Sequence, residues 1–188
     1  MQIMEDLLSG GSETATLEWT IAELIRNPKV MQKVTAEVRQ AFEARGSVAK
    51  DTLGELPYMH LVIREAFRLH MPTPLLLPRE CREPCQILGE FRPERFEGEA
   101  ATVDFRGTNF SFLPFGSGRR TCPGMAFGLA NIELALASLL FHFDWEGPPR
   151  EELDMEEAFG ITARRKADLL LRPVLRVPLR GVDSGDVR

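Results

Sequence analysis

One cysteine of this chain, Cys122, lies in a loop rich in glycine and arginine, directly before an apolar stretch with helical spacing. The loop reads Pro-Phe-Gly-Ser-Gly-Arg-Arg-Thr-Cys-Pro-Gly over residues 114–124, and the apolar stretch covers 125–143. A thiol at a helix N-terminus meets unpaired backbone N–H groups and the positive end of the helix dipole. Both favour the thiolate, the form that ligates metals and attacks electrophiles. The loop therefore indicates metal ligation or nucleophilic chemistry.

The residues around this cysteine narrow the chemistry. Gly116, Gly118 and Gly124 allow tight turns and let the backbone approach a large flat group without a Cβ in the way. Arg120 places a cation two residues from the sulfur, suited to pairing with a carboxylate. Two other interpretations stay open: a small buried hydrophobe, and a nucleophile, which needs a nearby histidine base. The histidines lie in segments without such a signature: His60, His70 and His142.

Residues 115–124 meet the full pattern Phe-x-x-Gly-x-Arg-x-Cys-x-Gly, which resembles the cysteine-ligand loop of the cytochrome P-450 superfamily. The resemblance implies that Cys122 is the metal ligand, the axial thiolate of the iron in haem b (iron protoporphyrin IX). It also implies that Phe115 packs beside the sulfur and that Arg120 pairs with a haem propionate. Gly118 and Gly124 complete the implied cofactor-binding loop. Residues 114–128 together with 159–166 are most similar to the large plant branch of the superfamily.

A second pattern, Glu65-x-x-Arg68, places a carboxylate and a guanidinium at i and i+3 on one face of a helix. Taken alone, it indicates a solvated surface pair worth a few tenths of a kcal/mol. Beside the cysteine loop it resembles the family's Glu-x-x-Arg pair, which Arg95 of Pro-Glu-Arg-Phe (93–96) completes. The resemblance implies a buried triad that braces the cysteine loop. Such a network is stable only if every charge is paired.

The stretch Gly-Gly-Ser-Glu-Thr over 10–14 interrupts an otherwise helical pattern. Two glycines in a helix each cost about 1 kcal/mol relative to alanine, so the stretch serves either close helix packing or a local groove. It resembles the family's distal-helix motif, which implies a groove for dioxygen and a water. Thr14 and Glu13 are then the candidate catalytic residues. Thr14 supports proton delivery to dioxygen, and Glu13 feeds protons from solvent.

Two apolar segments, 73–77 and 159–162, line a substrate pocket if the resemblance holds, and they indicate a small apolar or aromatic substrate. Arg79 follows the first segment, and the resemblance implies that it meets the other haem propionate. The implied activity is insertion of one oxygen atom of dioxygen into that substrate. The implied electron source is an NADPH-cytochrome reductase, as in plant secondary metabolism.

Composition excludes other classes of protein. The 188 residues carry 23 basic and 28 acidic side chains, a formal charge of −5, which argues against nucleic-acid binding. Three cysteines are too few for a disulfide framework and favour a reducing compartment. Cys81 and Cys85 have the spacing of half a zinc site, but no second pair follows. No apolar run reaches the roughly 18 residues needed to span a bilayer. The first residues do not have the basic-then-apolar pattern of a signal peptide.

The pattern predicts a mainly α fold with minor β structure, the C-terminal part of the cytochrome P-450 fold. Helical periodicity predicts helices over about 3–26, 29–44, 57–70 and 125–143. Short strands are expected over 75–78, 86–88, 159–162 and 169–177, with mainly loop over 89–121. We expect residues 1–180 to form an incomplete haem-thiolate monooxygenase domain and 181–188 a disordered tail.

The resemblance implies gaps as well. It covers only the C-terminal portion of the family's fold, and after Gly89 the family continues through strands and a short helix, whereas Glu90 follows here. Members lie on the cytosolic face of the endoplasmic reticulum; without the anchor, we expect this chain in the cytoplasm or leave its location open. Two hypotheses result: a haem-dependent monooxygenase, or a truncated non-catalytic remnant. The 188 residues alone are expected to bind haem weakly at best and to lack turnover.

Overall fold

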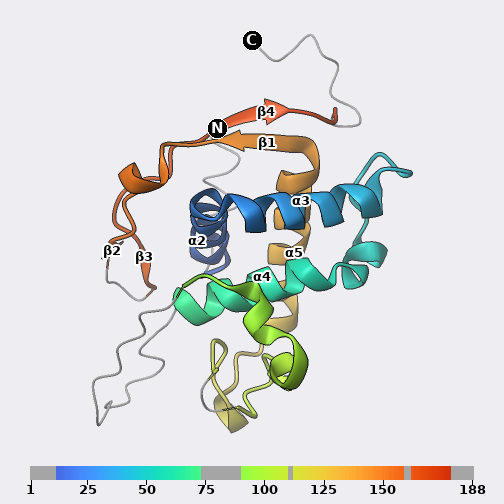
Figure 1. Cartoon of the computed structure of the whole chain (residues 1–188). Helices are drawn as coiled ribbons and strands as arrows, with labels where there is room; N and C mark the ends of the chain where they lie inside the picture. The colour runs from blue at the N-terminus through green and yellow to red at the C-terminus, as the bar shows by residue number, and fades with distance from the viewer. Residues whose placement is uncertain (1–11, 73–89, 110–111, 159–161, 179–188) are drawn as a thin grey trace.

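The computed structural model describes residues 12–72, 90–109, 112–158 and 162–178 (Figure 1). Several sequence predictions lie outside these residues. They concern the glycines before Ser12, the strands at 75–78 and 86–88, the tail, and three side chains: Arg79, Cys81 and Cys85.

Long helices dominate the described chain, as predicted. They are α2 (Ser12–Arg26), α3 (Pro28–Phe42), α4 (Pro57–Leu69) and α5 (Met125–His142). Short 3-10 helices connect them: η1 (Lys50–Glu55), η2 (Pro93–Phe96), η3 (Gly98–Thr102), η4 (Gly118–Arg120) and η5 (Arg150–Glu152). The strands β1 (Phe143–Glu146) and β4 (Arg172–Leu175) form one antiparallel pair. The strands β2 (Glu157–Ala158) and β3 (Arg164–Arg165) form another.

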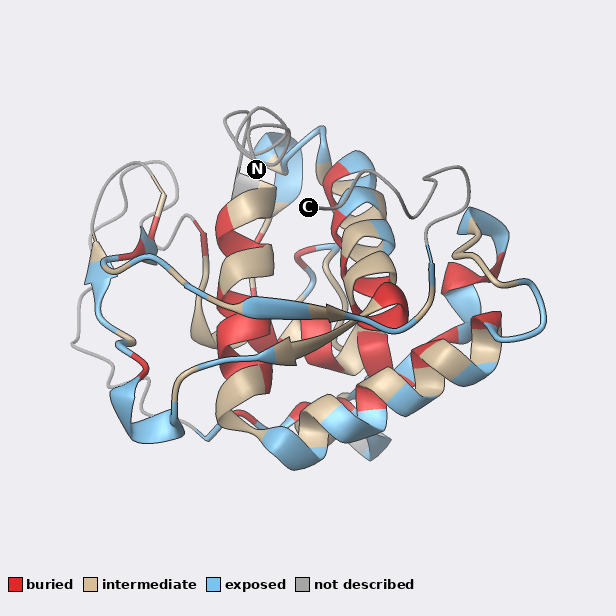
Figure 2. Cartoon of the chain, turned by 90° about the horizontal axis from the view of Figure 1, so that it is seen from above, coloured by how far each residue is buried: buried red, intermediate tan, exposed pale blue. Residues whose placement is uncertain are grey.

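The core lies between the four long helices α2, α3, α4 and α5, with the pair β1–β4 above it in Figure 2. Ile132, Leu136 and Leu140 of α5 are almost completely buried there. Phe127, near the start of the same helix, is 72% exposed. By length and composition α5 is apolar enough to cross a membrane, the one such helix among the described residues. Only 39% of this stretch is buried inside the structure, so the expectation that no run is long enough to span a bilayer is corrected for α5.

Side chains of α3 form hydrogen bonds with backbone groups at the start of α4 and the end of α5. The carboxylate of Glu37 accepts hydrogen bonds from the backbone N–H groups of Tyr58 and Met59, at 2.9 and 2.8 Å. It therefore caps α4, whose own N-cap residue makes no side-chain bond. Arg39 donates to the carbonyl oxygens of Leu140 and Phe143, at 3.2 and 3.0 Å, where α5 ends. The three helices are thus joined by polar contacts as well as by apolar packing.

Some predicted elements were wrong in extent. The last helix ends at His142, because Phe143 is extended and begins β1, which pairs with β4 from Phe143↔Leu175 to Glu146↔Arg172. The sequence pattern missed β1. Thr162 is not in a strand; the strands at this place are β2 and β3, before and after the predicted segment. Residues 90–121, expected as loop, contain three of the 3-10 helices.

Candidate functional site

The ligand loop, residues 115–124, turns back on itself immediately before α5. The backbone N–H of Cys122 donates to the carbonyl of Phe115 at 2.9 Å, which closes the loop. Thr121 donates to Gly118 from its N–H, at 3.2 Å, and from its hydroxyl, at 2.9 Å. Gly124 is the N-cap residue of α5, so Cys122 lies two residues before the cap. The thiol is free and exposed, which overturns the interpretation as a small buried hydrophobe.

Two glycines of this loop adopt a backbone conformation that other residues disfavour. Gly116 has φ +74° and Gly118 has φ +64°, both in the left-handed region. A Cβ on Gly118 would meet nothing within 4 Å, so the space beside it is open. Gly107, which the sequence reasoning passed over, has φ +74°, and a Cβ there would lie 2.5 Å from the carbonyl oxygen of Gly116. Only its position within the predicted loop 89–121 could have indicated this role.

Aromatic rings attach the loop to α4. The ring of Phe115 lies 5.2 Å from Phe67 of α4 and 5.7 Å from Phe105, centroid to centroid. Phe105 also contacts Phe67 at 5.4 Å and Phe112 at 5.5 Å, and Phe112 contacts Phe96 of η2 at 5.4 Å. Tilted and edge-on ring pairs at these distances are favourable beyond the area they bury. The phenylalanine predicted to sit beside the sulfur therefore also anchors the loop to the helix that carries Glu65.

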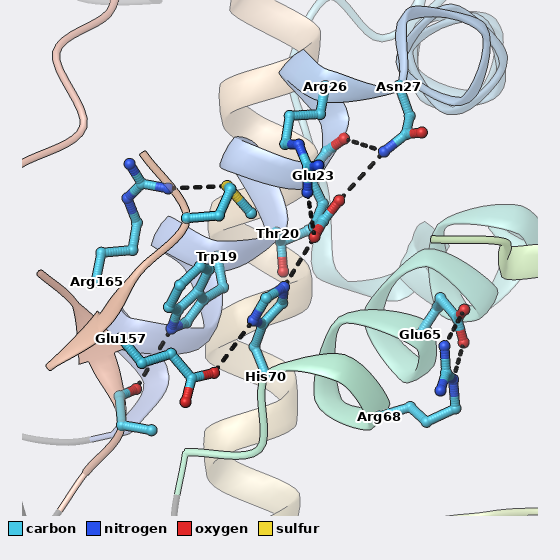
Figure 3. A network of polar contacts seen from close by, with 12 residues as sticks. Trp19, Thr20, Glu23, Arg26, Asn27, Glu65, Arg68, His70, Glu157 and Arg165 are labelled. Atoms are coloured by element: carbon cyan, nitrogen blue, oxygen red, sulfur yellow. Dashed lines mark hydrogen bonds and ion pairs between the residues drawn. The ribbon is translucent and has the colours of Figure 1, made fainter. Parts of the chain in front are cut away.

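The predicted triad is present, and we call Glu65, Arg68 and Arg95 the brace. Glu65 is fully buried and accepts two hydrogen bonds from Arg68, at 2.7 and 2.8 Å (Figure 3). It also accepts from the backbone N–H of Arg92 at 3.0 Å and from Arg95 at 3.4 Å. The surface-pair interpretation is therefore wrong. The expectation of full burial is corrected for the arginines, whose side chains are 21% exposed in Arg68 and 36% exposed in Arg95.

The two candidate catalytic residues lie in the first turn of α2, beside the start of α5. An ideal Cβ on Gly128, the fourth residue of α5, would lie 3.1 Å from the carboxylate oxygen of Glu13. The absence of a side chain at Gly128 therefore leaves room for this carboxylate. Thr14 is partly buried at the neighbouring position. The structure thus brings the first turn of α2 to the same end of α5 as the ligand loop.

The ligand loop has the features that a flat thiolate-ligated group requires. The sulfur is exposed, the space beside Gly118 is open, and a Cβ on Gly124 would find only the sulfur itself, at 3.8 Å. Arg119 and Arg120 are exposed on the same loop. Within the described parts of the chain, no group of three His, Cys, Asp or Glu side chains could hold a metal ion by itself. The arrangement fits a single thiolate ligand better than a multidentate metal site.

A helical core, a cysteine loop before a central helix and a Glu-x-x-Arg brace together define a cytochrome P450. The family model for cytochrome P450 matches residues 1–90 and 89–171, and the chain belongs to this family. Members bind haem b through a cysteine thiolate. The match falls into two segments that meet at residues 89 and 90, where the sequence analysis placed a missing stretch.

The similar proteins are plant enzymes. Desmethyl-deoxy-podophyllotoxin synthase of Sinopodophyllum hexandrum is 46% identical over 205 residues, covering 92% of this chain and 40% of that enzyme. Cytochrome P450 71D10 of Glycine max is 45% identical, covering 94% of this chain and 40% of that protein. Dolabradiene monooxygenase of Zea mays is 45% identical, with coverages of 94% and 41%. The chain spans about two fifths of the length of these relatives.

Proposed function

We propose that this chain is the haem-ligating region of a monooxygenase that inserts one oxygen atom of dioxygen into a small apolar or aromatic substrate. Electrons come from an NADPH-cytochrome reductase. The observation that carries the proposal is the exposed thiol of Cys122 in a closed, glycine-turned loop, in a chain of the cytochrome P450 family. When bound, a thiolate-ligated haem supplies the chemistry that activates dioxygen by favouring O–O cleavage.

The residues of the ligand loop have separate tasks in this proposal. Cys122 would hold the haem iron, and the hydrogen bond from its N–H to the carbonyl of Phe115 fixes the position of the loop backbone. Phe115 shields one side of the sulfur from water while it rests on Phe67. Gly118 and Gly124 leave space for the edge of the cofactor. Arg120 pairs with one propionate and Arg79, outside the described residues, with the other.

The first turn of α2 handles protons in this proposal. Glu13 is partly buried, and its carboxylate lies against Gly128, so it can take a proton from water at the edge of the site. Thr14 would support delivery of that proton toward dioxygen when haem and dioxygen are bound. The proximity of this turn to the start of α5 supports these roles.

The substrate class rests on composition and on relatives. The names of two relatives, dolabradiene monooxygenase and tabersonine 16-hydroxylase 1 of Catharanthus roseus, describe oxygen insertion into an organic molecule. The segments 73–77 and 159–162 are apolar for most of their length. We place the whole protein, like its family, on the cytosolic face of the endoplasmic reticulum.

The second candidate is that this chain is a truncated remnant, which keeps the haem-binding residues but does not catalyse the reaction. The observation that favours it is the family match in two pieces that meet at residues 89 and 90. A missing stretch there deprives strands of their hydrogen-bonding partners.

One experiment separates the two functions. The 188-residue chain and a version extended to the length of its relatives are each given haem, an NADPH-cytochrome reductase and a panel of apolar and aromatic compounds. Reductase-dependent product from the extended version supports the monooxygenase. A haem-thiolate spectrum without product in the extended version supports the second candidate, and absence of that spectrum from the extended version contradicts the assignment of Cys122 as the haem ligand.

A further inference from the structure

A pocket of about 490 Å³ lies where α2 ends and α3 begins, with β1 above this junction in Figure 1. Its walls are mainly apolar and come from α2, α3, β1 and the loop after β1: Leu24, Ile25, Met31, Phe143, Trp145 and Pro148. Every residue of its lining belongs to the described part of the chain. The pocket shares no residue with the ligand loop, the brace or the first turn of α2. Its volume and apolar lining are typical of sites that bind small organic molecules.

Two aromatic rings of β1 form one wall of the pocket, and contacts within the chain hold this wall in place. Nε1 of Trp145 donates to the carbonyl of Leu139 in α5 at 3.2 Å. The ring of Trp145 lies 5.7 Å from that of Phe143, centroid to centroid, with 52° between the planes. The two residues are two positions apart on the strand, so their side chains lie on the same face of it. A flat ring therefore finds a wall that is already formed, which keeps the entropic cost of binding low.

Two charged side chains line the pocket, and only one of them is neutralised by its neighbours. The carboxylate of Asp144 accepts hydrogen bonds from Arg39, at 2.7 Å, and from Arg176. Arg150 of η5 is exposed, and its guanidinium makes no ion pair or hydrogen bond with another described residue. The unpaired charge that the described residues place at this pocket is therefore positive.

We propose that this pocket binds an aromatic monocarboxylate. Its ring packs against Phe143 and Trp145, and its carboxylate pairs with Arg150, whose planar guanidinium can donate two parallel hydrogen bonds to a carboxylate. A cationic ligand is disfavoured, because the acidic side chain at the pocket, Asp144, is already held by two arginines. Binding at this place needs neither haem nor the oxygen chemistry, so the inference goes beyond the proposed function.

The two tryptophans of the chain give a site-specific signal for the test. Trp145 lines the pocket, whereas Trp19 is fully buried and does not. The probe is 2-naphthoate, added to the ¹⁵N-labelled 188-residue chain without haem. It should shift the indole N–H resonance of Trp145 to a saturable limit and leave that of Trp19 in place. The spectrum of Trp145→Phe assigns the two resonances.

The role of the charge is tested by exchanging it on the protein and on the ligand. Arg150→Met removes the charge and keeps an apolar stem, and it should weaken 2-naphthoate binding about fivefold, as expected for an exposed ion pair. The neutral analogue 2-naphthamide should bind several-fold more weakly than 2-naphthoate and be indifferent to Arg150→Met. Arg150→Lys should recover part of the affinity. Arg106→Met is the matched control, because the side chain of Arg106 is 81% exposed and does not line the pocket.

A third variant tests the place of binding. Thr35 of α3 lines the pocket and is partly buried, so Thr35→Phe fills it and should abolish the Trp145 shift. If this variant does not fold, the comparison of Arg150→Met with Arg106→Met decides alone. Equal affinity for 2-naphthoate and 2-naphthamide, or unchanged affinity in Arg150→Met, overturns the proposal, because the pocket then selects no carboxylate. A Trp145 shift that does not saturate, or that persists in folded Thr35→Phe, also overturns it.

The competing explanation is that another part of the longer protein covers this pocket, since the chain spans about two fifths of the length of its relatives. The same titration on the extended version separates the two. A saturable Trp145 shift with the same dependence on Arg150 supports the ligand site. Loss of the shift in the extended version, while the 188-residue chain still shows it, means that the pocket is filled by the protein itself and overturns the proposal.

Discussion

The brace and the ligand loop lie on either side of the contact between Phe67 and Phe115, and they are built in opposite ways. In the brace, the fully buried carboxylate of Glu65 receives hydrogen bonds from three residues. In the loop, the thiol of Cys122 is exposed and the space beside Gly118 is open. The polar groups of the brace find their partners within the chain, whereas the thiol of the ligand loop is left open for a ligand.

Because of this difference, we expect substitutions in the brace to change the stability of the fold and substitutions of exposed loop atoms to change ligand binding. A buried charge that loses its partner destabilises the fold whether or not a ligand is present. Replacing an exposed atom of the loop costs little folding stability, so we expect its replacement to reduce only ligand binding.

The largest expected effect is in the brace. Arg68→Ala leaves Glu65 buried with its strongest partner gone, which should lower the free energy of unfolding by about 3–5 kcal/mol. Arg95→Ala should cost about 1 kcal/mol, because its contact is longer and its side chain is 36% exposed. Urea unfolding followed by circular dichroism measures both. Equal stability of the wild type and Arg68→Ala would return Glu65 and Arg68 to the surface-pair interpretation.

The second largest loss of stability is expected where Gly107 contacts the ligand loop. Gly107→Ala adds a Cβ 2.5 Å from the carbonyl of Gly116 in a left-handed conformation, so the loop must shift. Gly118→Ala is the matched control, with a similar φ but open space around it, and should cost about 1–2 kcal/mol from backbone strain alone. We expect Gly107→Ala to be clearly the more destabilising of the two by thermal unfolding. Equal losses would mean that the loop is not pressed against residue 107.

The third effect concerns proton delivery by Thr14, and we expect it to leave the fold unchanged. In the extended protein, Thr14→Ala should still bind haem and substrate, but reducing equivalents should form peroxide or water instead of product. The measurement is product formed per NADPH consumed. A yield equal to that of the wild type would make Thr14 a helix residue without a catalytic task.

The smallest effect is in the β1–β4 pair, far from the loop. Hydrogen bonds from Arg176 and Arg39 hold the pKa of Asp144 below its usual value of 3.8, outweighing burial. Because the folded pKa is lowered, this contribution is present above pH 3.8 and is lost as the pH falls further. Asp144→Asn should therefore cost about 0.5–1 kcal/mol near neutral pH and flatten the loss of stability in acid. Unfolding curves at several pH values measure this, and identical acid limbs would contradict it.

The sequence predicted the parts of this molecule that depend on local pattern. The spacing of apolar residues located α3, α4 and α5 to within two residues at each end. The brace was predicted from resemblance, and the structure confirmed its contacts. The exposure of Arg95 was missed, since burial depends on how distant segments cover a side chain.

Other features depend on contacts between distant residues, which no local pattern shows. The strand β1 exists because β4, some thirty residues later, pairs with it. Gly107 is required because the ligand loop returns to within contact of it. The stack of His70 on Trp19 joins residues from two helices, and each residue alone has an ordinary local sequence. The roles of Glu13, Thr14 and Arg120 stay predictions, because they concern a bound cofactor and substrate.

The reduced carbon-monoxide difference spectrum tests most directly whether the fold presents Cys122 as an open ligand on a self-supported loop. It should be recorded on the extended, haem-loaded protein for the wild type, Cys122→Ser and Cys81→Ser. We predict that the wild type and Cys81→Ser absorb at the position of thiolate-ligated haem. Cys122→Ser should lose this absorption while its circular dichroism and unfolding midpoint stay those of the wild type. A thiolate spectrum that survives in Cys122→Ser, or that disappears in Cys81→Ser, would contradict the account.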